Sequence, residues 1–273
     1  MRFSGQTDLP FELYFVVGAP RTGTTILHAL ICTDESVNDY IAECSYFTAL
    51  LPPFALGWSN FDQHTYAYFP GGRPEFGRYH SQLLRAVLRD TWEQVGQPKK
   101  LALKDPVLSR QMGNLAQLLP ESKYVVSIRD ARDAIASRVT VMRKGKPDAV
   151  VSEQDVIRVC QEFNASYLPL LKAPDIFSGR ALVVAYEGLS RSGNLAPIET
   201  FMGITCRPDR VWQSELTDIN GPANNNEWRT AQYGKPLNPD SIGSYASILT
   251  PQQVQIVLDH CGPLMQQLGL PLT

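Results

Sequence analysis

The eight residues from Gly18 to Thr25, GAPRTGTT, constrain the fold of this chain more than any other stretch. They follow a short apolar run, LYFVV at 13–17, and run into TTILHALI, whose spacing predicts a helix. A glycine-rich turn between a buried strand and a helix points main-chain N–H groups and the positive end of the helix dipole at an anion. The pattern therefore predicts an α/β fold with a phosphate-binding loop after its first strand.

This loop departs at one position from the phosphate-binding loop of nucleoside triphosphatases. Gly18, Gly23 and Thr25 match G-x-x-x-x-G-K-[ST], but Thr24 stands in place of the lysine. In those enzymes the lysine and a Mg²⁺ ion neutralise charge on the γ-phosphate. Arg21 keeps a cation in the loop, which suits a terminal group with less charge than a γ-phosphate and requires no metal. The sequence therefore argues against ordinary ATP chemistry.

Further apolar runs alternate with helical spacing along the chain. The predicted strands after the first cover 39–43, 99–104, 123–128 and 181–186. The predicted helices after the first cover 109–119, 131–142 and 153–171. A last helix is predicted from Thr250, a candidate cap, with Pro251 at the first position and Gln253 completing a capping box. This order predicts a three-layer α/β/α architecture around a parallel sheet of roughly five strands.

One stretch interrupts the alternation. Residues 45–80 interleave Tyr, Phe and Trp with pairs of Pro and Gly. Such a composition suits a pocket wall for an organic ligand or an irregular satellite core. We expect residues 1–273 to form a single domain in which an insertion at about 45–98 lines the ligand pocket. The stretch at 220–239, rich in Gly, Asn and Pro, predicts a long loop.

The composition excludes several classes of protein. A formal net charge of -2 gives no bulk electrostatic reason to expect nucleic acid or an anionic membrane as a partner. The five cysteines lack C-x-x-C spacing, so neither a disulfide framework nor a zinc site is predicted. The apolar run at 13–17 is too short for a signal peptide or a transmembrane segment. A soluble, cytoplasmic protein is expected.

Two motifs together indicate a family. GAPRTGTT and SIRDARDAIAS (127–137) closely resemble the two nucleotide-binding motifs of sulfotransferases that use 3′-phosphoadenosine 5′-phosphosulfate (PAPS). LALKDP (101–106), AYEGL (185–189) and YGKPLNPDSIGSY (233–245) are similar to recurring segments of the tyrosylprotein-type and bacterial branch. The resemblance runs from Phe15 to about Leu249 and is loose between Ser45 and Lys99.

The resemblance implies a P-loop-like fold and an activity. It implies in-line transfer of a sulfuryl group from PAPS to a hydroxyl or an amine, without a metal. The other product is adenosine 3′,5′-bisphosphate (PAP).

The second motif also makes physical sense by itself. Arg129 ends a predicted strand, and Ser137 lies about two turns into the following helix, so both side chains can face one point. The arginine fork and the serine hydroxyl would suit the 3′-phosphate of the nucleotide, which ATP lacks. The alternative is that Arg129 pairs with Asp130 or Asp133 and that Ser137 is a neutral helix residue.

The resemblance further implies roles for individual residues. The cradle for the 5′-phosphosulfate comprises Arg21, Thr22, Gly23, Thr24 and Thr25. Lys104 matches the lysine that contacts the transferring group, and Tyr186 matches a tyrosine near the adenine. Thr230 and Lys235 match loop contacts to phosphate or sulfate. The structural alternatives are a surface lysine, a packed core tyrosine and an ordinary loop.

Glu43 is the expected base for the acceptor proton, because the tyrosylprotein and heparan branches carry a glutamate after the second strand. The phenol and steroid branch uses histidine, which keeps His28, His64 and His80 as candidates. Glu43 could instead be an ion-pair partner, for example of Arg21.

Two departures bear on the acceptor. Tyrosylprotein enzymes carry a cysteine where this chain has Ala102, and no stretch here predicts their membrane anchor. A small hydroxylated metabolite or a lipid is therefore favoured over a peptide tyrosine. Two other functions stay open, a metal-dependent P-loop kinase with Asp105 as the Mg²⁺ partner and a non-catalytic nucleotide-binding module.

Overall fold

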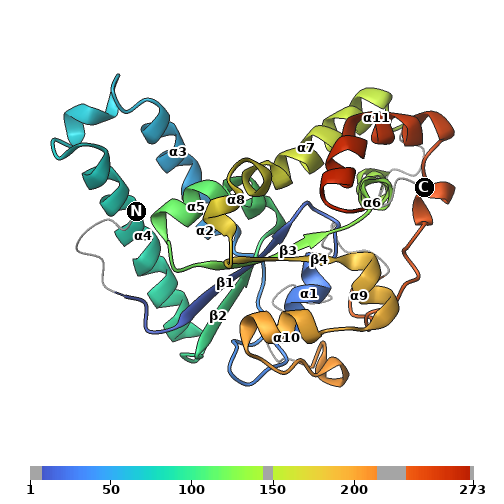
Figure 1. The fold of residues 1–273 in the computed structure, drawn as a ribbon, viewed down its shortest axis with the longest axis horizontal. Coiled ribbons are helices and arrows are strands. Elements are labelled where there is room, and N and C mark those ends of the chain that lie inside the picture. Colours follow the sequence, from blue (N-terminus) through green and yellow to red (C-terminus); the bar gives the residue numbers. More distant parts are fainter. Residues whose placement is uncertain (1–7, 144–149, 214–231, 271–273) are drawn as a thin grey trace.

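The computed structural model describes residues 8–143, 150–213 and 232–270. Its centre is a parallel sheet of four strands in the order β2-β1-β3-β4 (Figure 1). The strands are β1 (Glu12–Gly18), β2 (Lys100–Lys104), β3 (Lys123–Ile128) and β4 (Ala181–Ala185). The chain leaves β1 toward β2 on one side and later adds β3 on the other, so the carboxyl end of β1 is the topological switch point where such sheets bind ligands.

Helices cover both faces of this sheet, as Figure 1 shows. One face carries α1 (Thr24–Ile31), α9 (Tyr186–Ser192) and α10 (Ala196–Met202). The other face carries α2 (Ser45–Ala49), α3 (Leu51–Ser59), α4 (Gly72–Gln94), α5 (Met112–Leu118), α6 (Ala131–Arg143), α7 (Glu153–Lys172), α8 (Pro174–Phe177) and α11 (Pro251–Gln267). The three-layer α/β/α prediction is therefore confirmed. No helix in the described ranges is long and apolar enough to cross a membrane.

Strand β1 shows why the sequence has a continuous apolar run. Leu13, Phe15 and Val17 pack into the core on one face, whereas Tyr14 and Val16 pack into the core on the other. Successive side chains of a strand point to opposite faces, so a strand covered on both sides has no solvent-facing position. The capping box that predicted the last helix is also present, with Thr250 and Gln253 bonded reciprocally at the start of α11.

The predicted strand at 39–43 is wrong, since this segment has no strand structure and the described sheet has four strands. Only Val37 makes an isolated bridge, to Lys100. At the next residue, the side-chain carboxamide of Asn38 makes the bonds to β2 that a strand would make with its main chain. It accepts from Ala102 N at 2.7 Å and donates to Ala102 O at 3.1 Å. The segment then rejoins β2 through the bond from Cys44 N to Lys104 O at 2.9 Å, which keeps Glu43 at the end of that strand.

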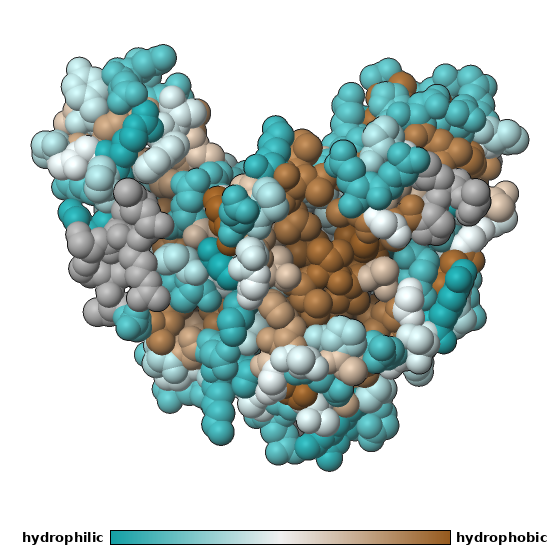
Figure 2. All heavy atoms as spheres, in the orientation of Figure 1, coloured by the Kyte–Doolittle hydropathy of each residue, from teal (hydrophilic) through white to brown (hydrophobic). Residues whose placement is uncertain are grey.

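The aromatic insertion forms a helical arm from α2, α3, the 3₁₀ turn η1 (Thr65–Tyr68) and α4. Part of its aromatic content is core, because Phe54 stacks on Phe76 at 5.6 Å and both are buried. Another part faces solvent, with Tyr46 71% exposed and Tyr68 81% exposed. Figure 2 shows a hollow between this arm and the side that carries α6, α7 and α11, with apolar surface gathered in it.

Candidate active site

The loop after β1 has the backbone conformation of an anion cradle. Arg21 and Gly23 both have positive φ, 75° and 91°, and Gly23 caps α1. A Cβ atom at Gly23 would lie 2.5 Å from Cδ2 of Tyr186, so only glycine fits beneath this ring. The tyrosine predicted near the adenine therefore packs directly on the loop, although it begins α9 and does not end a strand.

Side chains from elsewhere fasten this loop to the sheet. The Tyr167 hydroxyl, on α7, accepts from Ala19 N at 3.2 Å and donates to Ser127 O at 3.0 Å. Ser127, in β3, donates its hydroxyl to Thr22 O at 2.5 Å. The loop is thus held in shape by the protein itself, which is what a preorganised phosphate site requires. Sequence analysis gave neither residue a role, although Ser127 is the first residue of the second motif.

Glu43 and Lys104 form an ion pair at the edge of the loop. Lys104 Nζ lies 2.8 Å from Glu43 Oε1 and 3.5 Å from Thr25 Oγ1. The lysine side chain is 3% exposed, whereas that of the glutamate is 49% exposed. The structure therefore brings together a buried cation directed at the loop and a carboxylate open to an incoming molecule. Glu43 pairs with Lys104 here, whereas the sequence had suggested Arg21 as a partner.

A cluster of arginines lies on the other side of the loop. Arg21 Nε donates to Ser137 Oγ at 3.1 Å, and Arg129 Nη1 donates to Arg21 O at 3.1 Å. Burial, together with the nearby charges of Arg129 and Arg138, lowers the pKa of Arg21 to about 10. Three guanidinium groups thus lie close to one another, so an anion bound here would relieve their repulsion.

Arg129 has the environment expected of an anion ligand. Its side chain is 7% exposed, its guanidinium carbon lies 4.7 Å from the Tyr186 ring centroid, and Nη2 donates to Ser241 O at 2.6 Å. Its Nε is buried without a hydrogen-bond partner among the residues that the structure describes. A buried cationic donor of this kind is costly unless a ligand engages it. Ser241 is a contact that sequence reasoning missed.

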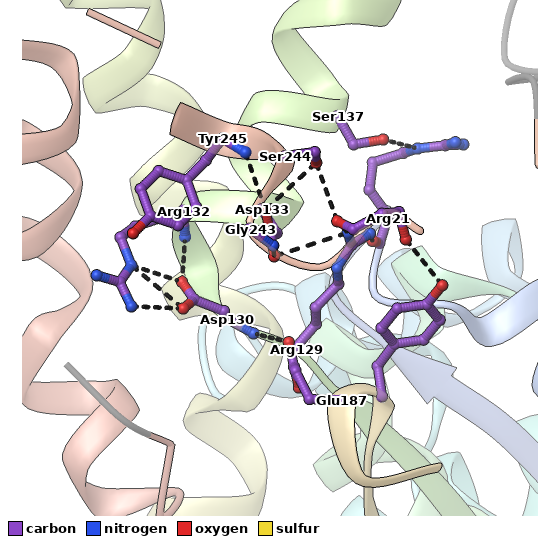
Figure 3. Close-up of polar contacts among 12 residues, drawn as sticks. Arg21, Arg129, Asp130, Arg132, Asp133, Ser137, Glu187, Gly243, Ser244 and Tyr245 are labelled. Carbon is purple, nitrogen blue, oxygen red and sulfur yellow. Dashed lines mark hydrogen bonds and ion pairs between the residues drawn. The ribbon is translucent and has the colours of Figure 1, made fainter. Parts of the chain in front are cut away.

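Of the two alternative partners proposed for Arg129, Asp130 is engaged elsewhere, whereas Asp133 forms a long ion pair with it (Figure 3). Asp130 pairs with Arg132 at 2.7 Å, and its N–H donates to Glu187 Oε1 at 2.8 Å. Asp133 approaches Arg129 only to 3.9 Å. Burial raises the pKa of Glu187, in α9, so this contact also marks a tightly enclosed turn. The turn between β3 and α6 therefore contacts α9 through Asp130 and the phosphate-binding loop through Arg129.

The remaining predicted contacts divide into three groups. Thr22 and Thr24 are buried in the loop and the first turn of α1. Lys235 is exposed, and its main-chain oxygen accepts from Trp212 Nε1 at 2.8 Å. Thr230 lies outside the described residues. Apart from Lys235 and Thr230, the predicted site residues thus lie in one continuous region at the ends of the strands.

The histidines considered as bases lie in other environments. His28 is fully buried with Nε2 3.0 Å from Ala102 O, and burial lowers its pKa to about 3. His80 is enclosed by Phe54 and Phe76, and burial lowers its pKa as well. His64 is exposed in the arm. Glu43 is the candidate that both contacts Lys104 and faces solvent.

Asp105, the residue that a metal-dependent kinase would need, has structural partners. Its carboxylate accepts from Thr48 Oγ1 at 2.6 Å and from Val107 N at 2.9 Å, capping the 3₁₀ turn η2 (Pro106–Gln111). Burial raises the pKa of this carboxyl group. Within the described ranges, no group of three or more His, Cys, Asp or Glu residues is placed to hold a metal ion.

The parallel sheet, the strand-loop-helix cradle and the arrangement at its edge define a protein of the P-loop-like nucleotide-binding class. Residues 14–207 match the model of the Sulfotransferase family, and the chain belongs to that family. It is therefore a sulfotransferase, and the kinase alternative loses its support.

Curated relatives and solved structures agree with this assignment. Protein-tyrosine sulfotransferase 2 of Gallus gallus is 24% identical over 267 residues, which cover 94% of this chain and 69% of that protein. Protein-tyrosine sulfotransferase 1 of Danio rerio is 23% identical over 271 residues, covering 96% and 72%. The sulfotransferase domain of the Synechococcus PCC 7002 olefin synthase superposes with a TM-score of 0.61 at 16% identity, covering 100% of this chain and 99% of that domain. The sulfotransferase domain from the curacin biosynthetic pathway gives 0.63 at 16% identity, covering 98% and 100%.

Proposed function

We propose that this sulfotransferase transfers a sulfuryl group from PAPS to the hydroxyl group of a small organic acceptor and releases PAP. The observation that carries the proposal is the continuity of the site. Lys104 contacts both Glu43 and Thr25 of the loop, and the loop carries Arg21, which bonds Ser137 and Arg129. An acceptor base, a cation and two anion subsites thus lie along one edge of the sheet.

The described residues fit the donor at both of its charged ends. The main-chain N–H groups of the loop, with Arg21, suit the 5′-phosphosulfate. Arg129, whose Nε is buried without a partner in the described chain, suits the 3′-phosphate together with Ser137. The Tyr186 ring, packed on Gly23 and beneath the Arg129 guanidinium, offers an aromatic surface for the adenine.

PAPS supplies the sulfuryl group, and two side chains serve the chemistry. Glu43 takes the proton from the acceptor hydroxyl, a role that contributes about 10²- to 10⁴-fold in typical enzymes. Lys104 Nζ, buried beside the loop, donates toward the oxygen that becomes negatively charged as its bond to sulfur breaks. Both side chains lie at the end of the loop near Thr25, where the donor and the acceptor would meet.

The surroundings of Glu43 favour an acceptor with an apolar body. The bond from Cys44 N to Lys104 O and the bond from Thr48 to Asp105 hold the start of α2 against the start of η2. Each of these two segments exposes one large apolar side chain, Tyr46 at 71% and Val107 at 45%. Exposed apolar side chains three residues along the chain from Glu43 and from Lys104 are suited to an aromatic or aliphatic alcohol.

A protein tyrosine is the second candidate acceptor. It is favoured by the names of the curated relatives, which are protein-tyrosine sulfotransferases matched over most of this chain. A tyrosine side chain is itself an aromatic alcohol, so the same apolar surroundings would accept it. The position of Ala102, deep in β2 and 0% exposed, offers no contact that would decide between the two.

The test is a transfer assay with PAPS that follows PAP release. One set of acceptors comprises small phenols and aliphatic alcohols, and the other comprises tyrosine-containing acidic peptides. We expect turnover with members of the first set that Glu43→Gln reduces by at least about 10²-fold. Turnover with peptides alone would replace the small acceptor by a protein tyrosine. Absence of PAP release with either set would contradict the proposed reaction.

A further inference from the structure

A short segment far along the chain crosses the candidate nucleotide site. We call Ser241–Tyr245 the strap; it leads into the 3₁₀ turn η5 (Ser244–Ser247). Its first residue makes two contacts to site residues, since Ser241 O accepts from Arg129 Nη2 at 2.6 Å and Ser241 Oγ lies 2.9 Å from the Tyr186 hydroxyl. The strap therefore helps to fix the orientation of the Arg129 guanidinium.

One buried carboxylate holds this strap in place (Figure 3). Asp133, in the first turn of α6, has a side chain that is 1% exposed. Its Oδ2 accepts from Gly243 N at 2.8 Å, and its Oδ1 accepts from Tyr245 N at 3.0 Å and from Ser244 Oγ at 3.3 Å. Both oxygens are thus satisfied by the strap, which lies 110 to 112 residues away in sequence.

Neighbouring contacts support the same arrangement. The Arg132 guanidinium carbon lies 4.7 Å from the Tyr245 ring centroid, while Arg132 also pairs with Asp130. Arg129 Nη2 lies 3.9 Å from Asp133 Oδ2, so the carboxylate partly balances the arginine that it helps to orient. A buried polar network of this kind fixes one geometry, because each lost partner leaves a buried group unpaired.

We propose that Asp133 is a positioning residue for the 3′-phosphate subsite, a role that rests on the proposed function. Asp133 binds the strap, the strap places Ser241 O, and Ser241 O orients Arg129 with its Nε left available. Loss of the Asp133 carboxylate releases the strap and lets the Arg129 guanidinium turn away. The effect is specific to ligands that carry a 3′-phosphate, since the hydrogen bonds and the ion pair of Asp133 within the described chain go to the strap and to Arg129, not to the loop that receives the 5′ end.

The first test compares two nucleotides on Asp133→Asn. The asparagine keeps the size of the side chain but cannot accept on both sides, so one strap N–H loses its partner. By isothermal titration, we expect the Kd for PAP to rise about tenfold and the Kd for AMP, which lacks the 3′-phosphate, to change by less than about twofold. An equal loss for PAP and AMP would show a general structural role and overturn the proposal.

A second test perturbs the strap from its solvent side and leaves Asp133 intact. Gly243 has a φ of 76°, and a Cβ atom there would meet nothing within 4 Å, so a substitution acts through the backbone alone. Gly243→Ala strains this left-handed position, whereas Gly243→Asn is a matched control because asparagine tolerates it. We expect Gly243→Ala to weaken PAP binding by on the order of fivefold and Gly243→Asn to stay near the wild type.

These outcomes distinguish a failure of the proposed function from a failure of the positioning role of Asp133. If the wild-type protein fails to bind PAP, the proposed function is wrong and the role of Asp133 falls with it. If the wild type binds PAP but Asp133→Asn and Gly243→Ala bind it equally well, the donor assignment stands and the positioning role is wrong. A fall in PAP affinity in both variants, with AMP affinity retained, supports the proposal.

Discussion

Glu43 has two functions in this account, because it is the proposed base and it also forms the ion pair with Lys104. Lys104 is almost completely buried, and a buried ammonium group without a counter-charge would be strongly destabilised. Glu43 Oε1, 2.8 Å away, supplies that charge while the rest of the side chain faces solvent. The proposed base is therefore also the counter-charge of the proposed cation before an acceptor arrives.

Glu43→Gln should separate chemistry from donor binding. The amide preserves the size of the side chain but cannot take up the acceptor proton, so kcat should fall by about 10²- to 10⁴-fold. The Kd for PAP should change by less than about threefold, because Glu43 bonds to Lys104 and it is Lys104 that approaches Thr25 of the loop. Glu35→Gln, at an exposed glutamate paired with Arg207, is the matched control for steady-state kinetics. A normal kcat in Glu43→Gln would exclude Glu43 as the base.

His28 should make the protein sensitive to acid. Burial lowers its folded-state pKa from 6.5 to about 3, so the unfolded chain binds a proton between these pH values that the folded chain does not bind. The free energy of unfolding should therefore fall as the pH drops through this window, by up to about 1.4 kcal/mol per pH unit. Urea unfolding at pH 7, 5.5 and 4 should show a shallower loss in His28→Gln than in the wild type. The exposed His260→Gln serves as control, and identical slopes in all three proteins would refute the assignment.

In the segment from Asn38 to Cys44, the predicted strand is wrong, but the predicted position of Glu43 is right. The sequence predicted a strand at 39–43, and it predicted Glu43 at the strand ends. The pattern of apolar residues could not reveal that the Asn38 side chain would replace main-chain pairing to Ala102. Glu43 is nevertheless in the expected place, because Cys44 N bonds to Lys104 O.

Asn38→Ala should loosen this segment. It leaves the N–H and C=O of Ala102 without their carboxamide partner in a buried position, which should lower the free energy of unfolding by about 2 kcal/mol. Because the same segment carries Glu43, kcat should fall as well, with little change in PAP affinity. Urea unfolding and steady-state kinetics would measure both, with Gln94→Ala, at an exposed amide side chain, as control. Unchanged stability would show that main-chain contacts alone hold the segment.

Across the protein, the sequence was most informative where local patterns decide the structure. The strands β1, β2, β3 and β4 follow from apolar runs, and the structure has them at the predicted places, with ends that differ by at most one residue. The strap lies in the segment at 233–245 that the family resemblance singled out, but its contacts with Arg129 and Asp133 were missed because contacts over more than a hundred residues leave no local signal. The 23-residue helix α4 was missed because Gly, Pro and aromatic residues at its start indicated an irregular region.

The same limit applies to the site. Sequence motifs brought Arg21, Lys104 and Arg129 to one sheet edge, but they could not show which atoms face each other. The pairing of Glu43 with Lys104, and of Arg21 with Ser137, depends on packing between elements. The class of the donor is therefore easier to infer than the class of the acceptor, whose surroundings we propose to include the helical arm.

The central claim is that this site binds a nucleotide through its 3′-phosphate, and calorimetry tests it most directly. The purified protein would be titrated with PAP and, in parallel, with ATP plus Mg²⁺, and both titrations repeated on Arg129→Ala and on Arg158→Ala, an exposed arginine that serves as control. We expect tight, magnesium-independent binding of PAP that weakens by at least about tenfold in Arg129→Ala and is unchanged in the control. Preference for ATP with Mg²⁺, or PAP binding that is indifferent to Arg129, would contradict the account.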